Sequence, residues 1–98
     1  MDKKLAGYIG MACRARKILI GDTAIKAIQK KDAKIVLLAE DCSLNTQKKV
    51  LDKCTFYQVK VLKVESKAEL AYTIGRADVS FVAVVDEGFA KAIQNCLK

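Results

Sequence analysis

The residues from Ile20 to Lys26 are the part of this sequence best suited to binding chemistry. Gly21 lets a backbone approach a ligand closely, and the first amides of a helix that starts there would point outward. Thr23 adds a hydroxyl group, and Lys26 follows about one turn later on the same side. Together these groups could hold a phosphate and the edges of bases. The same pattern is also typical of an ordinary strand-to-helix turn, with Asp22 as the helix cap.

A second polar segment, from Glu40 to Ser43, follows an apolar run and is expected to emerge beside Gly21. Carboxylates accept hydrogen bonds from base amino groups, so Glu40 and Asp41 are candidate base contacts. Asp41 or Ser43 could instead cap the next helix. Cys42 lies near that helix start, but its acidic neighbours oppose a lowered thiol pKa and the chain holds no His to act as a base. We therefore predict no catalytic residue and no metal site, and four reduced, mostly buried cysteines.

The charge of the chain is strongly positive and unevenly distributed. Lys and Arg number 18 against 11 Asp and Glu, a formal net charge of +7. Nine of the basic residues and three of the acidic ones lie within the first 34 residues. A concentrated basic patch attracts a phosphate backbone, although such patches also serve solubility and protein docking. The candidate phosphate contacts in this segment are Arg16, Lys17, Lys26 and Lys30.

The aromatic residues are scattered through the expected helices and strands and do not accompany the basic segment. They are Tyr8, Phe56, Tyr57, Tyr72, Phe81 and Phe89. A protein that binds single strands would be expected to present a row of aromatic side chains for base stacking. We therefore expect this chain to recognise the shape of a folded RNA.

Hydrophobic periodicity predicts helices that alternate with short strands. Two runs, 35–39 and 81–85, are too apolar for exposed strands and suit strands that are covered on both faces. The expected strands are 18–20, 34–40, 59–64 and 81–85, and the expected helices are 2–15, 23–31, 44–54, 87–97 and one from the capping box Ser66–Glu69 to Gly75. This order predicts the α/β class: a three-layer α/β/α sandwich with a small mixed sheet of about four strands. Ligands of such sheets bind at the carboxyl ends of strands.

With 98 residues, the chain is expected to be one domain, residues 1–98. Its hydrophobic content of 52% excludes a disordered tail, and its apolar runs are too short to span a bilayer. The N-terminal residues do not form a secretory signal. We therefore expect a cytoplasmic protein with no membrane partner.

Six blocks of the sequence carry a resemblance to a known family. They are residues 10–17, 21–28, 33–41, 45–46, 52–54 and 84–89. In this order they resemble the small ribosomal L7Ae-type family of kink-turn RNA-binding proteins, particularly its short bacterial members. The resemblance covers practically the whole chain.

The resemblance implies an α/β/α sandwich that grips a sharply bent RNA duplex at tandem sheared G·A pairs. It places the family's strand-to-helix junction at Gly21, Asp22, Thr23 and Lys26. Asp22 and Thr23 replace the side chains that are usual in the family, so the individual base contacts stay open. The acid after the central strand carries over to Asp41. The loop that packs on a flipped-out nucleotide corresponds to Arg76, Ala77, Asp78 and Val79.

These observations predict a non-enzymatic RNA-binding protein that recognises structured, kink-turn-like RNA. The expected partner is ribosomal RNA or an mRNA leader, with a ribosomal or translation-associated role. No cofactor and no small-molecule substrate are implied. The alternative is a protein-protein interaction module on the same fold, without catalytic activity. Such a module would use an apolar patch and bind independently of salt.

Overall fold

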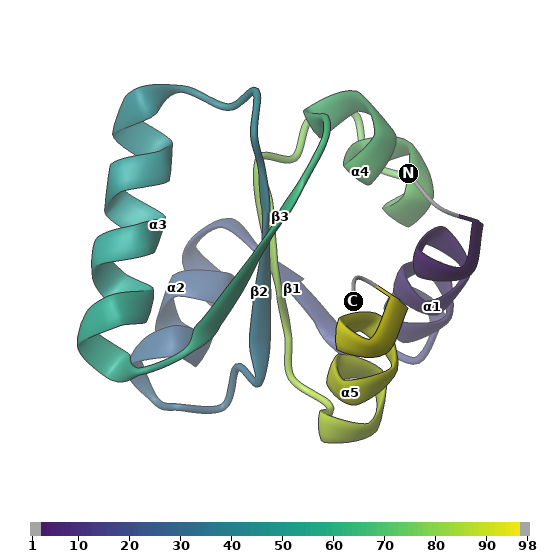
Figure 1. The fold of residues 1–98 in the computed structure, drawn as a ribbon, viewed down its shortest axis with the longest axis horizontal. Helices are drawn as coiled ribbons and strands as arrows, with labels where there is room; N and C mark the ends of the chain where they lie inside the picture. The colour runs from purple at the N-terminus through teal and green to yellow at the C-terminus, as the bar shows by residue number, and fades with distance from the viewer. Residues whose placement is uncertain (1–2, 97–98) are drawn as a thin grey trace.

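The computed structural model describes residues 3–96, which form a mixed four-stranded sheet with helices on both faces (Figure 1). The α/β/α sandwich expected from the sequence is thereby confirmed. No helix in this range is long and apolar enough to cross a membrane. In chain order the elements are α1 (Lys3–Arg14), β1 (Ile18–Ile20), α2 (Gly21–Gln29), β2 (Ile35–Ala39), α3 (Leu44–Tyr57), β3 (Lys60–Val64), α4 (Lys67–Ile74), β4 (Phe81–Val84) and α5 (Glu87–Cys96).

These bounds lie close to those expected from the sequence. The largest difference is three residues, at the end of α3. Positions 2 and 97, where the first and last helices were expected to begin and end, lie outside the described residues.

The strands follow the order β1-β4-β2-β3 across the sheet. β2 pairs in parallel with β3, whereas β4 runs antiparallel to both β1 and β2. Ile18 and Ile35 both pair with Val84, so β1 and β2 begin at the same end of the sheet. We call this the lower end, as drawn in Figure 1, and we call the end where β1, β2 and β3 finish the upper end. Gly21 and Glu40 therefore leave the sheet at its upper end.

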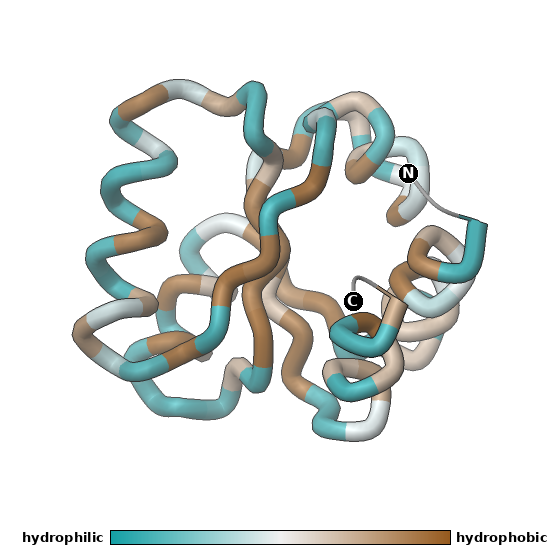
Figure 2. Tube along the Cα trace, viewed as in Figure 1, coloured by the Kyte–Doolittle hydropathy of each residue, from teal (hydrophilic) through white to brown (hydrophobic). Residues whose placement is uncertain are grey.

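The central strand β2 is buried along its whole length. Its alternate side chains face opposite layers: Ile35, Leu37 and Ala39 pack with α1, α4 and α5, while Val36 and Leu38 pack with α2 and α3. Figure 2 shows these hydrophobic strands enclosed between the two helical layers. The continuous apolar run is therefore explained by two cores, one on each face of the sheet.

The second helix begins two residues earlier than the sequence indicated. It starts at Gly21 instead of Thr23, and Ile20 occupies the N-cap position without a side-chain hydrogen bond. Asp22 lies in the first turn, so the prediction that it caps this helix is wrong. Gly21 has a positive φ of 58°. That conformation costs a residue with a side chain about 1–2 kcal/mol, which explains why glycine stands here.

Side chains from the loops that precede α3 and α4 accept hydrogen bonds from the first amides of these two helices. Ser43 caps α3, because its side-chain oxygen accepts a hydrogen bond from the Thr46 amide at 3.2 Å. Asp41 instead accepts a hydrogen bond from the Lys67 amide at 2.8 Å, at the start of α4. Ser66 also caps α4, as the capping-box pattern predicted. Of the two caps considered for α3, only Ser43 is therefore confirmed.

Candidate nucleic-acid interface

A shallow pocket of about 260 Å³ lies at the upper end of the sheet. It joins the start of α2, the start of α3 and the loop that leads into β4. Its lining residues are Ile20, Gly21, Thr46, Asp78, Val79, Ser80 and Phe81. Parts of the two segments that the sequence suggested as separate contacts thus line one pocket: Gly21 from the junction, and Asp78 and Val79 from the loop 76–79. Asp22, Thr23, Arg76 and Ala77 do not line it.

The start of α2 offers hydrogen-bonding groups to a ligand at this pocket. The first N–H groups of a helix have no partner within the helix, and Ile20 supplies no side-chain acceptor for them. Gly21 is exposed, and a Cβ atom there would meet no protein atom within 4 Å. The Thr23 hydroxyl donates to the Ile20 carbonyl oxygen at 2.8 Å, which leaves the hydroxyl oxygen available as an acceptor. The junction therefore combines backbone donors with one oriented acceptor.

The loop before β4 contributes an apolar floor and an exposed rim. Val79 is only 3% exposed and belongs to the core beneath α1, α4 and α5. Phe81, at the start of β4, is half-buried and also lines the pocket. Arg76, Ala77 and Asp78 are exposed. Any apolar contact with a ligand must therefore come from the floor of the pocket, with polar contacts from the rim.

Outside the segment 20–26, three lining residues, Thr46, Ser80 and Phe81, were not among the site residues expected from the sequence. The hydroxyl of Thr46 accepts a hydrogen bond from the Ser43 hydroxyl at 2.9 Å, which holds it in place at the start of α3. The one signal for Thr46 in the sequence was its place in the block 45–46. Ser80 and Phe81 carried no comparable signal.

Glu40 and Asp41 leave the sheet at the upper end, but neither is among the described residues that line the pocket. One carboxylate oxygen of Asp41 is occupied by the Lys67 amide, so this side chain faces α4. The contact of Asp41 with a base edge stays a prediction. Glu40 is exposed, and its backbone carbonyl accepts a hydrogen bond from Gln47 Nε2 at 3.1 Å.

The basic residues of the N-terminal third do not form one continuous surface. α2 runs from the upper to the lower end of the sheet, so Lys30 at its C-cap lies about 13 Å along the helix from Gly21. Arg16 and Lys17 precede β1 and lie at the lower end as well. Of the four phosphate contacts predicted in this segment, only Lys26 lies away from the lower end. It is exposed and lies midway along α2, between the Gly21 junction and Lys30.

The surroundings of the cysteine thiols indicate a role in packing and not in nucleophilic chemistry. All four cysteines are free, and Cys42 and Cys54 are buried. Burial raises the pKa of the Cys42 thiol, opposed in part by a backbone hydrogen bond. Burial also raises the pKa of the Cys54 thiol to about 11. Within residues 3–96, no group of three His, Cys, Asp or Glu side chains could hold a metal ion.

The raised pKa of Cys54 predicts slow reaction with a thiol-specific reagent. At pH 8 this thiol is almost entirely protonated, and only the thiolate reacts, so labelling should be roughly 100-fold slower than in the unfolded chain. Its rate should rise with pH up to about 11. The half-buried Cys13 and Cys96 should react first. Peptide mapping by mass spectrometry measures each rate, and a Cys54 that is labelled as fast as Cys96 would contradict the prediction.

Comparison with known proteins supports the architecture. The model of the "Ribosomal protein L7Ae/L30e/S12e/Gadd45 family" matches residues 3–94. RNA-binding protein YlxQ of Bacillus subtilis (strain 168) is 50% identical over 90 residues, 91% of this chain and 90% of the relative. RNA-binding protein YlxQ of Enterococcus faecium is 39% identical over 97 residues, 98% of this chain and 93% of the relative.

One solved structure, of a protein with unknown function from Bacillus halodurans, has a TM-score of 0.90 to this fold at 34% identity. The match covers 96% of each chain. Sequence and fold thus lead to the same assignment along nearly the whole chain. This protein belongs to the Ribosomal protein L7Ae/L30e/S12e/Gadd45 family.

Proposed function

We propose that this chain is a non-enzymatic RNA-binding protein that recognises a sharply bent, kink-turn-like duplex. The observation that carries the proposal is the upper pocket, which joins the Gly21 junction to the loop 76–79. The amides at the start of α2 suit phosphate and base-edge oxygens. The floor formed by Val79 and Phe81 suits a base that is turned out of its stack. Two relatives that are named RNA-binding proteins add to this support.

The dimensions of the pocket favour a nucleotide of a larger RNA over a small metabolite. Its volume of about 260 Å³ lies below the roughly 300–1,000 Å³ that is usual for small-molecule sites. We therefore propose no cofactor and no small-molecule substrate. The proposed partner is ribosomal RNA or an mRNA leader, bound in the cytoplasm by a single domain of residues 1–98.

The alternative is a protein-interaction module, which would use an apolar docking patch. The exposed large hydrophobic residues in the described part of the chain are Met11, Leu44, Phe56 and Tyr72. None of these four lines the upper pocket. The site described above therefore favours RNA.

The proposal is tested by measuring the affinity of the purified chain for a labelled kink-turn duplex. The comparison is the same duplex with its sheared G·A pairs replaced by Watson–Crick pairs. We expect the kinked duplex to bind more tightly by on the order of tenfold. Equal affinity for the two duplexes would overturn the proposal.

Lys26→Ala should weaken binding to every structured RNA by about fivefold, without changing the preference among them. Lys26 is exposed and forms no ion pair with another described residue, so its charge is available to a phosphate. The slope of log affinity against log salt should become shallower by about 0.9. Lys91→Ala on α5 is the control and should change neither quantity. A selective loss for the kinked duplex would show that Lys26 contributes to specificity and not to phosphate contact alone.

A further inference from the structure

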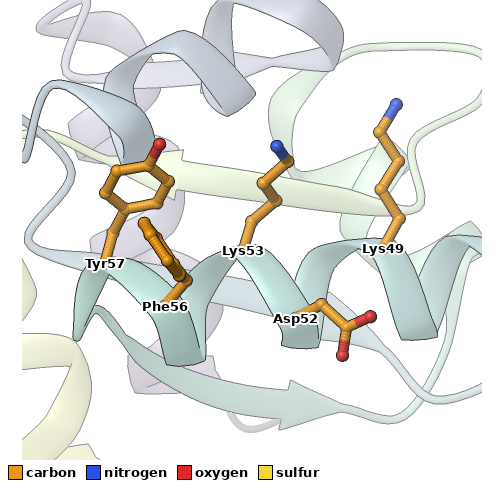
Figure 3. A pocket seen from close by; sticks show the side chains of 5 residues that line it. All are labelled: Lys49, Asp52, Lys53, Phe56 and Tyr57. Atoms are coloured by element: carbon orange, nitrogen blue, oxygen red, sulfur yellow. The ribbon is translucent and has the colours of Figure 1, made fainter.

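The outward face of α3 carries a second shallow hollow, of about 490 Å³ (Figure 3). Its lining residues all come from this one helix and are Lys49, Asp52, Lys53, Phe56 and Tyr57. The hollow shares no lining residue with the upper pocket. It therefore forms a separate surface, which none of the contacts considered above uses.

An exposed aromatic ring lies at one end of this hollow. Phe56 is 77% exposed. Its ring meets the Tyr57 ring edge to face, with the centroids 4.8 Å apart and an interplanar angle of 74°. Tyr57 is half-buried and packs against the core between α2, α3 and the sheet. Tyr57 thus holds the pair against the core, while the Phe56 ring is exposed to solvent. A nucleobase can stack on such an exposed ring.

Two lysines extend from the same face. Figure 3 shows Lys49 and Lys53 pointing to the side of α3 on which the Tyr57 ring lies, while the Asp52 carboxylate points away from them. Residues 49, 53 and 57 follow one another at intervals of four, which places them in one row along the helix. Neither lysine forms an ion pair within the described part of the chain. Their positive charge is therefore available to an anionic ligand.

We infer that this face of α3 binds an unpaired segment of RNA, with a base stacked on Phe56 and phosphates contacting Lys49 and Lys53. The helix rises about 12 Å from Lys49 to Tyr57, which matches roughly three stacked nucleotides at 3.4 Å each. This site goes beyond the proposed function, because it is separate from the upper pocket and takes unpaired instead of kinked RNA. Although the aromatic residues are scattered along the sequence, the end of α3 holds two of them in line with two lysines.

The surroundings of the hollow extend the positive field. α3 finishes at the lower end of the sheet. α2 packs against α3 and finishes at the same end, with Lys30 and Lys31 exposed. An RNA strand that leaves Phe56 can therefore continue toward these basic residues.

Charge also argues against a second copy of this chain as the occupant. Two copies of this face carry four lysines and two Asp52 carboxylates, so a two-fold contact would bring together a net positive charge. A net positive charge opposes such a contact. An RNA strand carries a negative charge on every nucleotide and so complements both lysines.

The inference is tested with the full chain and a labelled ten-nucleotide oligoadenylate, which contains no duplex to kink. Phe56→Ala should weaken its binding about tenfold, because one base loses its stacking partner. The matched control, Tyr72→Ala, removes a ring that is 88% exposed on α4 and should change the affinity less than about twofold. Circular dichroism checks that both variants keep the fold.

The double variant Lys49→Ala with Lys53→Ala tests the phosphate contacts. It should make the salt slope for oligoadenylate shallower by about 1.4, since each contact with a single strand contributes about 0.7. An unchanged slope would overturn the assigned role of these lysines. Sedimentation of the parent and of Phe56→Ala adds a check for self-association. A dimer that depends on Phe56, with oligoadenylate binding unaffected, would assign the face to a second copy and overturn the inference.

A parallel measurement with a blunt kink-turn duplex keeps this inference distinct from the proposed function. Phe56→Ala should leave binding to that duplex within about twofold. If oligoadenylate binding depends on Phe56 but the parent shows no preference for the kinked duplex, only the proposed function fails. If the kinked duplex is preferred but oligoadenylate is not bound, or is bound equally by Phe56→Ala, only this inference fails.

Discussion

Gly21→Val is expected to abolish the preference for a kinked over a straight duplex while the protein stays folded. Gly21 has φ +58°, a conformation that β-branched residues strongly disfavour. A Cβ there meets no protein atom within 4 Å, so the fold bears only the backbone strain. The added side chain would occupy the space through which an RNA backbone approaches the amides of α2. Measured with the two duplexes, a preference on the order of tenfold should fall below about twofold.

Gln58→Val supplies the matched control for backbone strain. Gln58 has φ +59° at the C-cap of α3, and a β-branched residue there meets the same conformational penalty at the lower end of the sheet. Gln58→Val should lose less thermal stability than Gly21→Val, because Gln58 already bears the cost of a side chain at positive φ, and it should keep the preference for the kinked duplex. A folded Gly21→Val protein with the parent's preference would move recognition away from this junction, and the loop 76–79 would then be tested first.

Leu37→Ala is expected to lower the free energy of unfolding by about 3–4 kcal/mol. Leu37 lies in the middle of the central strand with 0% of its surface exposed, packed beneath α1, α4 and α5. Truncation removes buried methyl groups and leaves a cavity that the surrounding helices can only partly fill. Because small domains are stable by about 5–15 kcal/mol in total, this is a large fraction of the stability. Urea unfolding followed by circular dichroism measures the change.

The same substitution at Leu44 provides the control for Leu37→Ala. Leu44 is 82% exposed at the start of α3, so its truncation should change the free energy of unfolding by less than about 0.5 kcal/mol. Below its unfolding transition, Leu37→Ala should keep its preference for the kinked duplex, because Leu37 does not line the upper pocket. Equal destabilisation by the two variants would show that the sheet is not the stabilising centre of the fold.

Local signals in the sequence were sufficient to predict the order of the elements and the fold class. The apolar run of β2 predicted a strand covered on both faces, and every residue of it is buried. Ser43 and Ser66 were recognisable as helix caps, and Gly75 ends α4 with φ +73°. These features depend on a residue and its neighbours within about one turn, so the sequence alone contains the information that determines them.

The sequence alone did not show which acidic side chain caps which helix. Asp22 and Asp41 both stand at positions where a carboxylate can cap the following helix. The structure places Asp22 within the first turn of α2 and pairs Asp41 with the Lys67 amide of α4. The second outcome depends on a contact between elements, because the folded chain brings the first amide of α4 to Asp41. A side chain that can accept several hydrogen bonds is assigned to one of them only when the chain is folded.

The sequence by itself determined which residue types this protein has for binding a polyanion, and the tertiary structure decided which of them meet. Gly21 and Val79 are far apart along the chain but line one pocket, because β1 ends beside the start of β4. Arg16 and Lys30 are close to Gly21 in the sequence, yet they lie at the opposite end of the sheet. The physical reason is that β1 runs from the lower to the upper end of the sheet and α2 runs back, so neighbours along the chain become separated in space. Strand pairing at the same time joins segments that are distant in the sequence.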